Sequence, residues 1–306
     1  MTGDAPQAVI ETAGLTKRFG PGVLAVDRLD LRVEPGQVYG FLGPNGAGKT
    51  TTLRMLVGLL RPTAGSAMVA GHTPGAPAGL AQIGVMVEEA VFYPYLSGRD
   101  NLLVVARYCR LKPSAVEPAL SWVGLQPAAK FKFKTYSTGM KQRLGLAAAL
   151  MKDPKVLLLD EPSNGLDPEG IVWLRQLLRG FAAKGGTALV SSHLLGEIEQ
   201  MCDRVAIVQS GRLLREGPVA SLRAAAQLEI TAAPLDAAAR LVEGLLGAAA
   251  VRVADGRLIV TSGTDRAAEI NRALVGAGIE VSELYRRQAS LEESFLRLTA
   301  EEGGPG

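Results

Sequence analysis

The sequence has few cysteines and no long hydrophobic run, and each absence excludes a class of protein. Cys109 and Cys202 are the only cysteines in the 306 residues, and their spacing fits neither a metal site nor a redox pair. The uninterrupted apolar runs, such as residues 156–159, fall far short of the ~20 residues that cross a bilayer. The sequence therefore predicts reduced cysteines and no membrane-spanning helix.

The N-terminus also lacks the features of a secretory signal. It reads M-T-G-D-A-P-Q, with one acid, no basic cluster and no apolar centre, so we expect the protein to stay in the cytosol. The net charge of +3 is only mildly basic and argues weakly for nucleic acid. A chain of 306 residues is long enough for one large α/β core and a smaller appendage.

The most informative feature that is present is the segment G-P-N-G-A-G-K-T at residues 43–50. It follows a strand-like stretch and precedes a helical pattern, which is the context of a phosphate-binding loop. Its glycines let successive N–H groups point at phosphate oxygens, and the helix N-terminus adds partial positive charge. A glycine-rich turn before a helix is the competing interpretation, and the flanking pattern disfavours it. The residues predicted to hold a nucleoside triphosphate are Gly43, Asn45, Gly46, Ala47, Gly48, Lys49, Thr50 and Thr51.

A second set of candidate residues ends a buried strand at residues 156–161. Two acids at the end of an apolar strand are costly unless a ligand needs them. In phosphate-loop hydrolases the first acid holds Mg²⁺ opposite the loop hydroxyl, so Asp160 is the expected metal partner of Thr50. Glu161 can orient or deprotonate the attacking water. A plain surface turn after a strand is the alternative.

Another anion site is predicted where the helix of residues 139–151 begins. The segment 136–143 reads Y-S-T-G-M-K-Q-R, and a serine and a glycine at a helix start offer a hydroxyl and free N–H groups. The preceding run K-F-K-F-K at 130–134 forms a basic neighbourhood with Lys141 and Arg143. Nucleic acid is one polyanion that it fits, but the residues that follow favour the triphosphate itself.

Strands alternating with helices between residues 8 and 220 predict an α/β fold with a mostly parallel core sheet. From about 98 to 127 the pattern is helical, and prolines at 113, 118 and 127 are expected to divide it. The tail of residues 222–300 predicts a small α+β domain with the order β-α-β-β-α-β, a split βαβ arrangement. A last helix is expected from Ser290, with Glu293 completing a capping box. An irregular alanine-rich tail is the alternative.

With these motifs in order, the sequence resembles the ATP-binding subunits of ABC transporters. The order is the phosphate loop at 43, S-T-G-M-K at 137, the acidic strand at 156–161, N-G-L-D at 164–167 and S-S-H at 191–193. The resemblance implies an ABC-type ATPase domain with an antiparallel β subdomain and a helical subdomain. It also implies ATP and Mg²⁺ as cofactors and a head-to-tail dimer, most simply a homodimer. In that dimer Ser137, Thr138, Gly139 and Met140 would complete the partner's ATP site.

The resemblance further assigns His193 to the γ-phosphate and Asp167 to the subunit junction. His72 lies in no such motif and is expected to be a solvent-exposed loop residue. Phe19 stands where a tyrosine usually stacks on adenine, which keeps the aromatic face. Thr138 and Met140 replace a glycine and a glutamine of the family pattern.

The sharpest departure is Glu88, which stands where the family carries a glutamine near Mg²⁺ and the attacking water. The pattern of residues 83–102 resembles the bacitracin, lantibiotic and drug-resistance exporter ATPases, which carry such a glutamate, and residues 289–295 look like the tail of that branch. This implies that Glu88 acts at the metal and in catalysis, and it implies a bacterial exporter of a drug, peptide antibiotic or lipid. The expected partner is a separate integral membrane permease, which places the chain at the cytoplasmic face of the membrane.

The aromatic stretch 92–95 is a candidate groove for a cytoplasmic helix of that permease, and packing within the helical subdomain is equally compatible with it. The competing class is a soluble ABC ATPase that acts on ribosomes or DNA. Such proteins usually fuse two ATPase modules or insert long coiled coils, and neither is present, so no nucleic acid partner is expected.

Overall fold

The computed structural model describes residues 8–88, 91–222 and 227–287. The chain divides into two compact units, Met1–Val219 and Ala220–Gly306. The helix predicted from Ser290 and the tail pattern of residues 289–295 lie outside the described residues.

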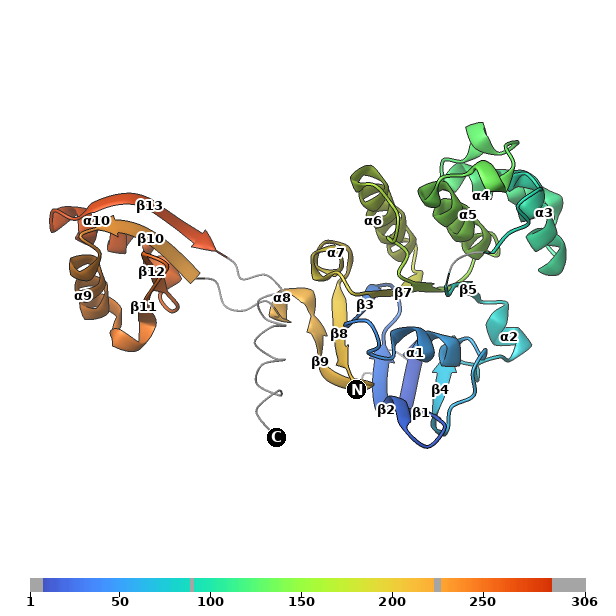
Figure 1. The fold of residues 1–306 in the computed structure, drawn as a ribbon, viewed down its shortest axis with the longest axis horizontal. Coiled ribbons are helices and arrows are strands. Elements are labelled where there is room, and N and C mark those ends of the chain that lie inside the picture. Colours follow the sequence, from blue (N-terminus) through green and yellow to red (C-terminus); the bar gives the residue numbers. More distant parts are fainter. Residues whose placement is uncertain (1–7, 89–90, 223–226, 288–306) are drawn as a thin grey trace, which may run out of the picture. The chain divides into compact units, whose positions relative to one another are not determined.

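The first unit is built on a six-stranded sheet with the order β5-β6-β7-β3-β8-β9 (Figure 1). All neighbouring strands are parallel except β8 and β9. The strands β3, β6 and β7 are buried along their whole length, which explains the apolar runs in β3 and β6. The strands are β3 (Val38–Leu42), β5 (Ile83–Met86), β6 (Val156–Asp160), β7 (Thr187–Ser192), β8 (Arg204–Gln209) and β9 (Arg212–Pro218).

The first unit also contains a three-stranded antiparallel sheet with the order β2-β1-β4. Its inward side chains form one hydrophobic core with helix α1 and the core sheet. Figure 1 shows helices α6 and α7 on the other face of the core sheet. The elements of this part are β1 (Ile10–Phe19), β2 (Val23–Val33), β4 (Ala64–Val69), α1 (Lys49–Leu56), α2 (Pro77–Leu80), α6 (Pro168–Ala183) and α7 (Leu195–Met201). The short helix α8 (Val219–Leu222) contains the boundary between the two units.

The helical part of the first unit consists of α3 (Gly98–Tyr108), α4 (Val116–Trp122) and α5 (Thr138–Leu150). Helix α3 begins at Ser97, whose hydroxyl accepts a hydrogen bond from the Asp100 N–H at 3.0 Å. The expectation that Pro118 divides the helical region was wrong. Pro118 lies in the first turn of α4, where a missing N–H costs no helical hydrogen bond.

The second unit has the element order β-α-β-β-α-β and one antiparallel sheet with the strand order β11-β12-β10-β13. Its two helices are amphipathic and cover the apolar side chains of the sheet. The elements are β10 (Gln227–Ala233), α9 (Leu235–Leu246), β11 (Val251–Ala254), β12 (Arg257–Val260), α10 (Ala267–Gly276) and β13 (Glu280–Arg287).

The buried carboxylate of Glu229 accepts hydrogen bonds from three side chains on the neighbouring strands of this sheet. Tyr285 Oη donates to it at 2.6 Å, and the guanidinium groups of Arg287 and Arg257 donate at 2.9 and 3.4 Å. These hydrogen bonds, led by that of Tyr285, hold the pKa of Glu229 below its usual range. The charged form is therefore satisfied although the residue is buried.

His72 is not the exposed loop residue that the sequence suggested. It is half-buried, its Nε2 lies 3.0 Å from Gln82 Nε2, and its backbone pairs with Val69. The reason is Gly79, where any Cβ would lie 2.9 Å from the His72 Cβ. The missing side chain leaves the space that the imidazole fills.

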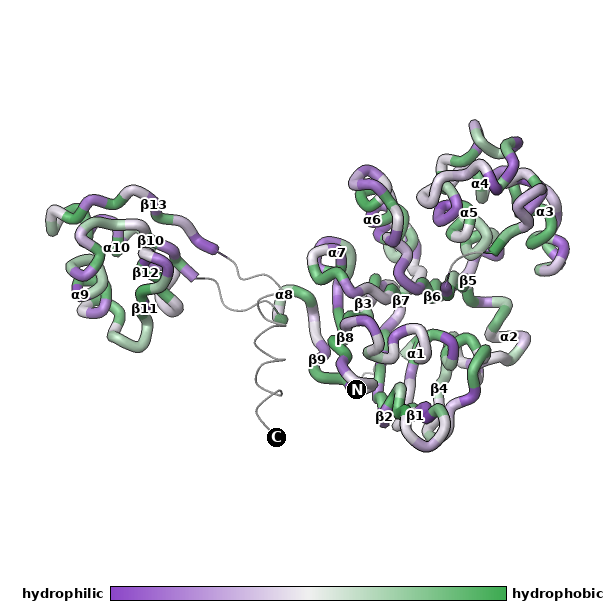
Figure 2. Tube along the Cα trace, in the orientation of Figure 1, coloured by the Kyte–Doolittle hydropathy of each residue, from purple (hydrophilic) through white to green (hydrophobic). Residues whose placement is uncertain are grey.

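Among the residues that the structure describes, no helix combines the length and apolar character needed to span a bilayer. In Figure 2 hydrophobic and hydrophilic residues interleave along most elements.

Candidate functional site

The loop between β3 and α1 takes a form that favours glycine at three positions. A Cβ on Gly43 would lie 2.3 Å from the Val208 carbonyl oxygen, and one on Gly48 would lie 2.3 Å from that of Ala25. Gly46 and Gly48 have positive φ angles of 83° and 96°, which other residues adopt only with strain. The loop therefore presents backbone N–H groups in a tight turn at the start of a helix, a geometry that suits phosphate oxygens.

The side chain of Lys49 lies inside this loop and is only 6% exposed. Its Nζ donates to the Gly43 carbonyl at 2.7 Å and to that of Pro44 at 3.3 Å. The same Nζ lies 3.3 Å from Glu161 Oε1. A lysine ammonium held against two loop carbonyls and one carboxylate is a positioned cation at the centre of the loop.

Thr50 and Asp160 meet although 110 residues separate them. The Thr50 hydroxyl donates to Asp160 Oδ2 at 2.7 Å, and Ser191 Oγ donates to the other carboxylate oxygen at 2.5 Å. Hydroxyl and carboxylate oxygens are the ligands that Mg²⁺ prefers. The donor set therefore fits one magnesium ion that keeps several of its ligands from water and phosphate. No cluster of three or more His, Cys, Asp or Glu that could cage a metal occurs in the described part of the chain.

Glu161 lies next to Asp160 in a strained backbone conformation, with a φ angle of 45°. Its N–H donates to Ser191 Oγ at 3.0 Å, and its Oε2 lies 2.9 Å from His193 Nδ1. The carboxylate is thus held between the Lys49 ammonium and the His193 imidazole. This position suits a group that orients or deprotonates water.

Thr50, Asp160 and Glu161 border a cavity of about 510 Å³ at the carboxyl ends of the parallel strands. Glu88 also lines it, has a positive φ angle of 68°, and forms an ion pair with Arg54 of α1. The lining residues are Thr50, Glu88, Thr138, Lys141, Gln142, Asp160, Glu161, Asn164 and Gly165.

A second hollow, of about 490 Å³, lies on the face that carries Ser137, Thr138, Gly139, Met140 and Asp167. Ser137 caps α5 by accepting from the Met140 N–H at 3.2 Å, and Asp167 caps α6 by accepting from the Gly170 N–H at 2.8 Å. Thr138 lines both hollows, whereas Ser137 lines only this one.

Phe19 ends strand β1, is 43% exposed, and has Lys17 Nζ 5.2 Å from its ring centroid. Its stacking on adenine remains a prediction, as do the contacts of Asn45, Ala47 and Thr51 with phosphate.

Sequence reasoning missed two residues that organise the site. Ser191 bridges Asp160 and the Glu161 N–H, and Arg54 holds Glu88. Ser191 stood in the S-S-H pattern, so its position near the end of a buried strand was an available signal. Arg54 carried no signal, because its pairing depends on how helix α1 and the segment after β5 approach each other.

Comparison with known proteins decides the family. The model of the ABC transporter family matches residues 26–164. The bacitracin transport ATP-binding protein of Bacillus licheniformis is 40% identical over 297 residues, covering 95% of this chain and 97% of that protein. The chain belongs to the ABC transporter family.

Other relatives in the ABC transporter family match along most of the chain. A daunorubicin resistance ATP-binding protein of Streptomyces coeruleorubidus is 38% identical over 310 residues and covers 96% of both chains. The solved ATP-binding subunit of an ABC transporter has a TM-score of 0.64 at 27% identity, covering 70% of this chain and 91% of its own. A dimeric ATP-binding cassette bound to ADP and Pi shares the fold, with a TM-score of 0.62 at 23% identity, 69% of this chain and 98% of its own. The predicted ABC-type α/β fold is thereby confirmed.

Proposed function

We propose that this chain is the ATP-hydrolysing subunit of a bacterial ABC exporter for a drug, peptide antibiotic or lipid. The observation that carries the proposal is the convergence of Lys49, Thr50, Asp160, Glu161 and His193 at one end of the sheet. The direction of transport is supported by the relatives that are named for bacitracin transport and daunorubicin resistance. The domains of this subunit would be residues 8–220 for ATP hydrolysis and a small α+β domain of residues 222–300.

In this proposal each residue has a distinct task. The loop N–H groups and Lys49 bind the phosphates, and Thr50 with Asp160 would hold Mg²⁺ together with Glu88. Bound Mg²⁺ would neutralise charge on the phosphate oxygens. Glu161 takes the proton of the attacking water, and His193 keeps the Glu161 carboxylate in place and reaches the terminal phosphate.

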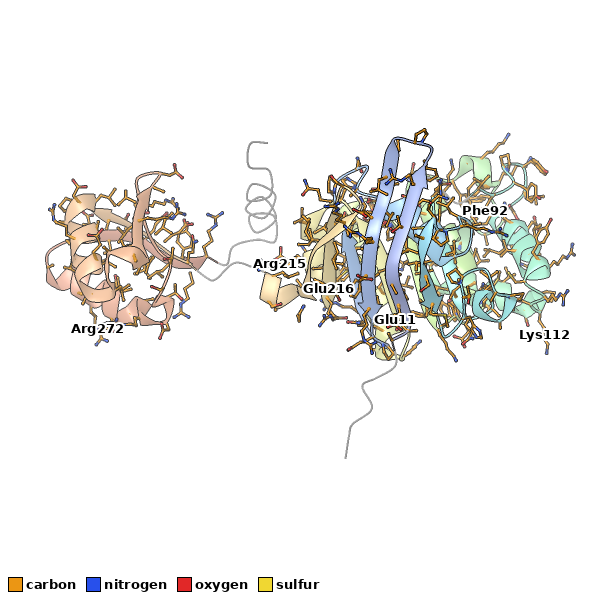
Figure 3. The ribbon with its side chains drawn as sticks, turned by 90° about the horizontal axis from the view of Figure 1, so that it is seen from below. Glu11, Phe92, Lys112, Arg215, Glu216 and Arg272 are labelled. Carbon is orange, nitrogen blue, oxygen red and sulfur yellow. The ribbon has the colours of Figure 1, made fainter. Side chains whose placement is uncertain are left out.

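The proposed assembly is a homodimer of ATPase subunits on a separate membrane permease, at the cytoplasmic face of the membrane. The hollow that Ser137 and Asp167 line supports a two-chain site, because Ser137 does not line the cavity of its own Thr50 and Asp160. A groove of about 510 Å³ on the helical part offers a place for a permease helix. Phe92, labelled in Figure 3, lines this groove together with Val91, Tyr93, Pro94, Asn101, Val104, Val105 and Tyr108.

Purification from membranes tests this assignment against a soluble ABC ATPase that acts on ribosomes or DNA. We expect the tagged chain to copurify with an integral membrane protein after detergent extraction. Copurification with ribosomes or nucleic acid in its place would overturn the exporter assignment.

Replacing Lys49 tests nucleotide binding. Lys49→Ala should lower affinity for a fluorescent ATP analogue at least about tenfold and abolish hydrolysis, since charge-assisted contacts to phosphate are strong. Lys155→Ala, at an exposed lysine of the same unit, is the matched control and should bind normally. Unchanged affinity of a folded Lys49→Ala protein would contradict the assignment.

Glu88 is tested by Glu88→Gln. The carboxylate binds a hard cation more strongly than an amide and repels the γ-phosphate, so the variant should need more Mg²⁺ for hydrolysis. Folding and ATP binding should be kept, because an exposed ion pair such as Arg54–Glu88 contributes about 0–1 kcal/mol. Cargo export should fall more than ATPase activity, because Glu88 lies close in sequence to the groove that begins at Val91.

The measurement is the ATPase rate against Mg²⁺ concentration, with export from cells in parallel. Asp236→Asn, an exposed acid of the second unit, should match the wild type in both. If Glu88→Gln also matches the wild type in its Mg²⁺ dependence and in export, Glu88 is only a surface acid.

A further inference from the structure

Four residues on the helical part form an exposed basic surface, which we call the lysine patch: Lys130, Phe131, Lys132 and Lys134. The backbone beneath it is fixed by hydrogen bonds to the segment before α3. The Phe133 N–H donates to the Leu96 carbonyl at 2.9 Å, and the Lys134 N–H donates to that of Pro94 at 3.0 Å. The Gly98 N–H donates to the Phe131 carbonyl at 3.2 Å. The patch is therefore displayed on a loop that is hydrogen-bonded to residues 94–98.

The charge of the lysine patch is not neutralised within the described chain. No Asp or Glu occurs between Glu117 and Asp153 in the sequence. Glu117 itself is engaged by Arg99. Across residues 8–88, 91–222 and 227–287, no carboxylate lies within salt-bridge distance of the three patch lysines. Three adjacent unpaired ammonium groups attract an anionic surface.

The nucleotide site does not account for these lysines. Lys141 lines the cavity that Thr50 and Asp160 share, and Arg143 lines the hollow of Ser137. None of the lysine patch residues lines either space. The basic run thus separates into Lys141 and Arg143, which face the hollows, and the patch, which faces elsewhere.

The two phenylalanines of the run also separate. Phe133 is 7% exposed and packs against Phe92 and Tyr136, with ring centroids 5.2 and 5.8 Å away. Phe131 is 60% exposed between two lysines. An exposed aromatic ring beside lysine side chains is typical of surfaces that bind the headgroup region of a bilayer.

We propose that the lysine patch binds the anionic phospholipid headgroups of the membrane that holds the permease. The inference rests on the proposed function, because that function brings this part of the chain to a membrane. The patch adjoins the groove through its hydrogen bonds to residues 94–98, so both would face the bilayer side. Single-stranded nucleic acid stacks bases on several aromatic rings, and within residues 130–134 only Phe131 is exposed. The exposed ring of Tyr95 lies on the neighbouring segment, so an oligonucleotide is the competing ligand in the test below.

Vesicle flotation of the full chain tests the proposal without the permease. Vesicles of phosphatidylcholine alone are compared with vesicles that contain about 30% phosphatidylglycerol, at low and high salt. We expect binding to the anionic vesicles only, and weaker binding at high salt. The double variant Lys132→Glu/Lys134→Glu should lower the affinity at least about 20-fold, since each lysine near such a surface contributes about fivefold.

The matched control is Lys155→Glu/Lys184→Glu, which changes the net charge equally at exposed lysines elsewhere in the first unit. This control should bind anionic vesicles with an affinity within about twofold of the wild type. Both double variants should keep the ATPase activity of the free chain. Phe131→Ala should weaken vesicle binding at high salt as well as at low salt, because the contribution of the Phe131 ring to binding is apolar and is not screened by salt.

Three results would overturn the inference: no binding to anionic vesicles, equal loss in both double variants, or patch-dependent binding to a labelled single-stranded oligonucleotide that exceeds vesicle binding. The proposed function fails separately. If vesicle binding depends on the patch but no membrane protein copurifies, the exporter assignment is wrong and the lipid surface stands. If a membrane protein copurifies but vesicles do not bind, the reverse holds.

Discussion

Glu161→Gln should retain ATP binding and lower hydrolysis at least ~100-fold, the usual scale when a general base is lost. The amide fills the same space between Lys49 and His193 but cannot take a proton from water. The nucleotide would therefore remain intact in the site. Because bound ATP joins the two subunits in the proposed assembly, the variant should accumulate as an ATP-bound dimer.

Steady-state ATPase assays and size-exclusion chromatography with ATP measure the two effects. Glu34→Gln, an exposed acid in the turn before β3, is the control and should hydrolyse ATP at the normal rate. Near-normal turnover of Glu161→Gln would remove Glu161 from the catalytic role and leave it as a partner of Lys49 and His193.

Mixing two inactive chains should restore hydrolysis. A Ser137→Arg chain keeps its own Lys49, and a Lys49→Ala chain keeps its own Ser137. If each ATP site takes Lys49 from one chain and Ser137 from the other, a mixed dimer contains one intact site and one site with both defects. Random pairing of equal amounts would then recover up to roughly a quarter of wild-type activity.

The control for this experiment is a mixture of Lys49→Ala and Glu161→Gln chains. Both residues belong to the same half of the site, as their 3.3 Å contact indicates, so every site in the mixed dimer remains defective. Recovery only in the first mixture supports a site shared between chains. No recovery in either, with exchange of chains verified by two tags, would mean that each site is completed within one chain.

The parts of the site that sequence predicted are those fixed by local structure. The turn before α1 has positive φ angles at Gly46 and Gly48, which favour glycine through the local backbone alone. Asp160 and Glu161 stand at the end of a strand whose burial is evident from its apolar run. The parallel core sheet was predicted for the same reason. A strand that is buried on both faces does not alternate apolar and polar residues, so its sequence differs from that of a half-exposed strand. Pro118 was misjudged because its effect depends on where the helix starts, which the pattern does not fix to one residue.

The parts that sequence did not predict depend on pairing between distant segments. Ser191 reaches Asp160 because strands β6 and β7 align these two residues as neighbours, and a shift of one residue would turn the hydroxyl to the other face. Ser163 donates to Glu197 of α7, which links the loop after Glu161 to the helix after His193. Such contacts follow from the approach of segments that are distant in the sequence, which no single motif contains.

The pairing of Gln227 with Arg287 brings together the first and last residues of the segment 227–287 of the second unit, because β10 and β13 are antiparallel neighbours. We therefore expect that residues 227–287 can be exchanged for the equivalent segment of another relative, because the two ends to be joined lie side by side. The segment can thus be treated as an exchangeable module. A series of chimaeras can separate its contribution to transport from that of the ATPase unit.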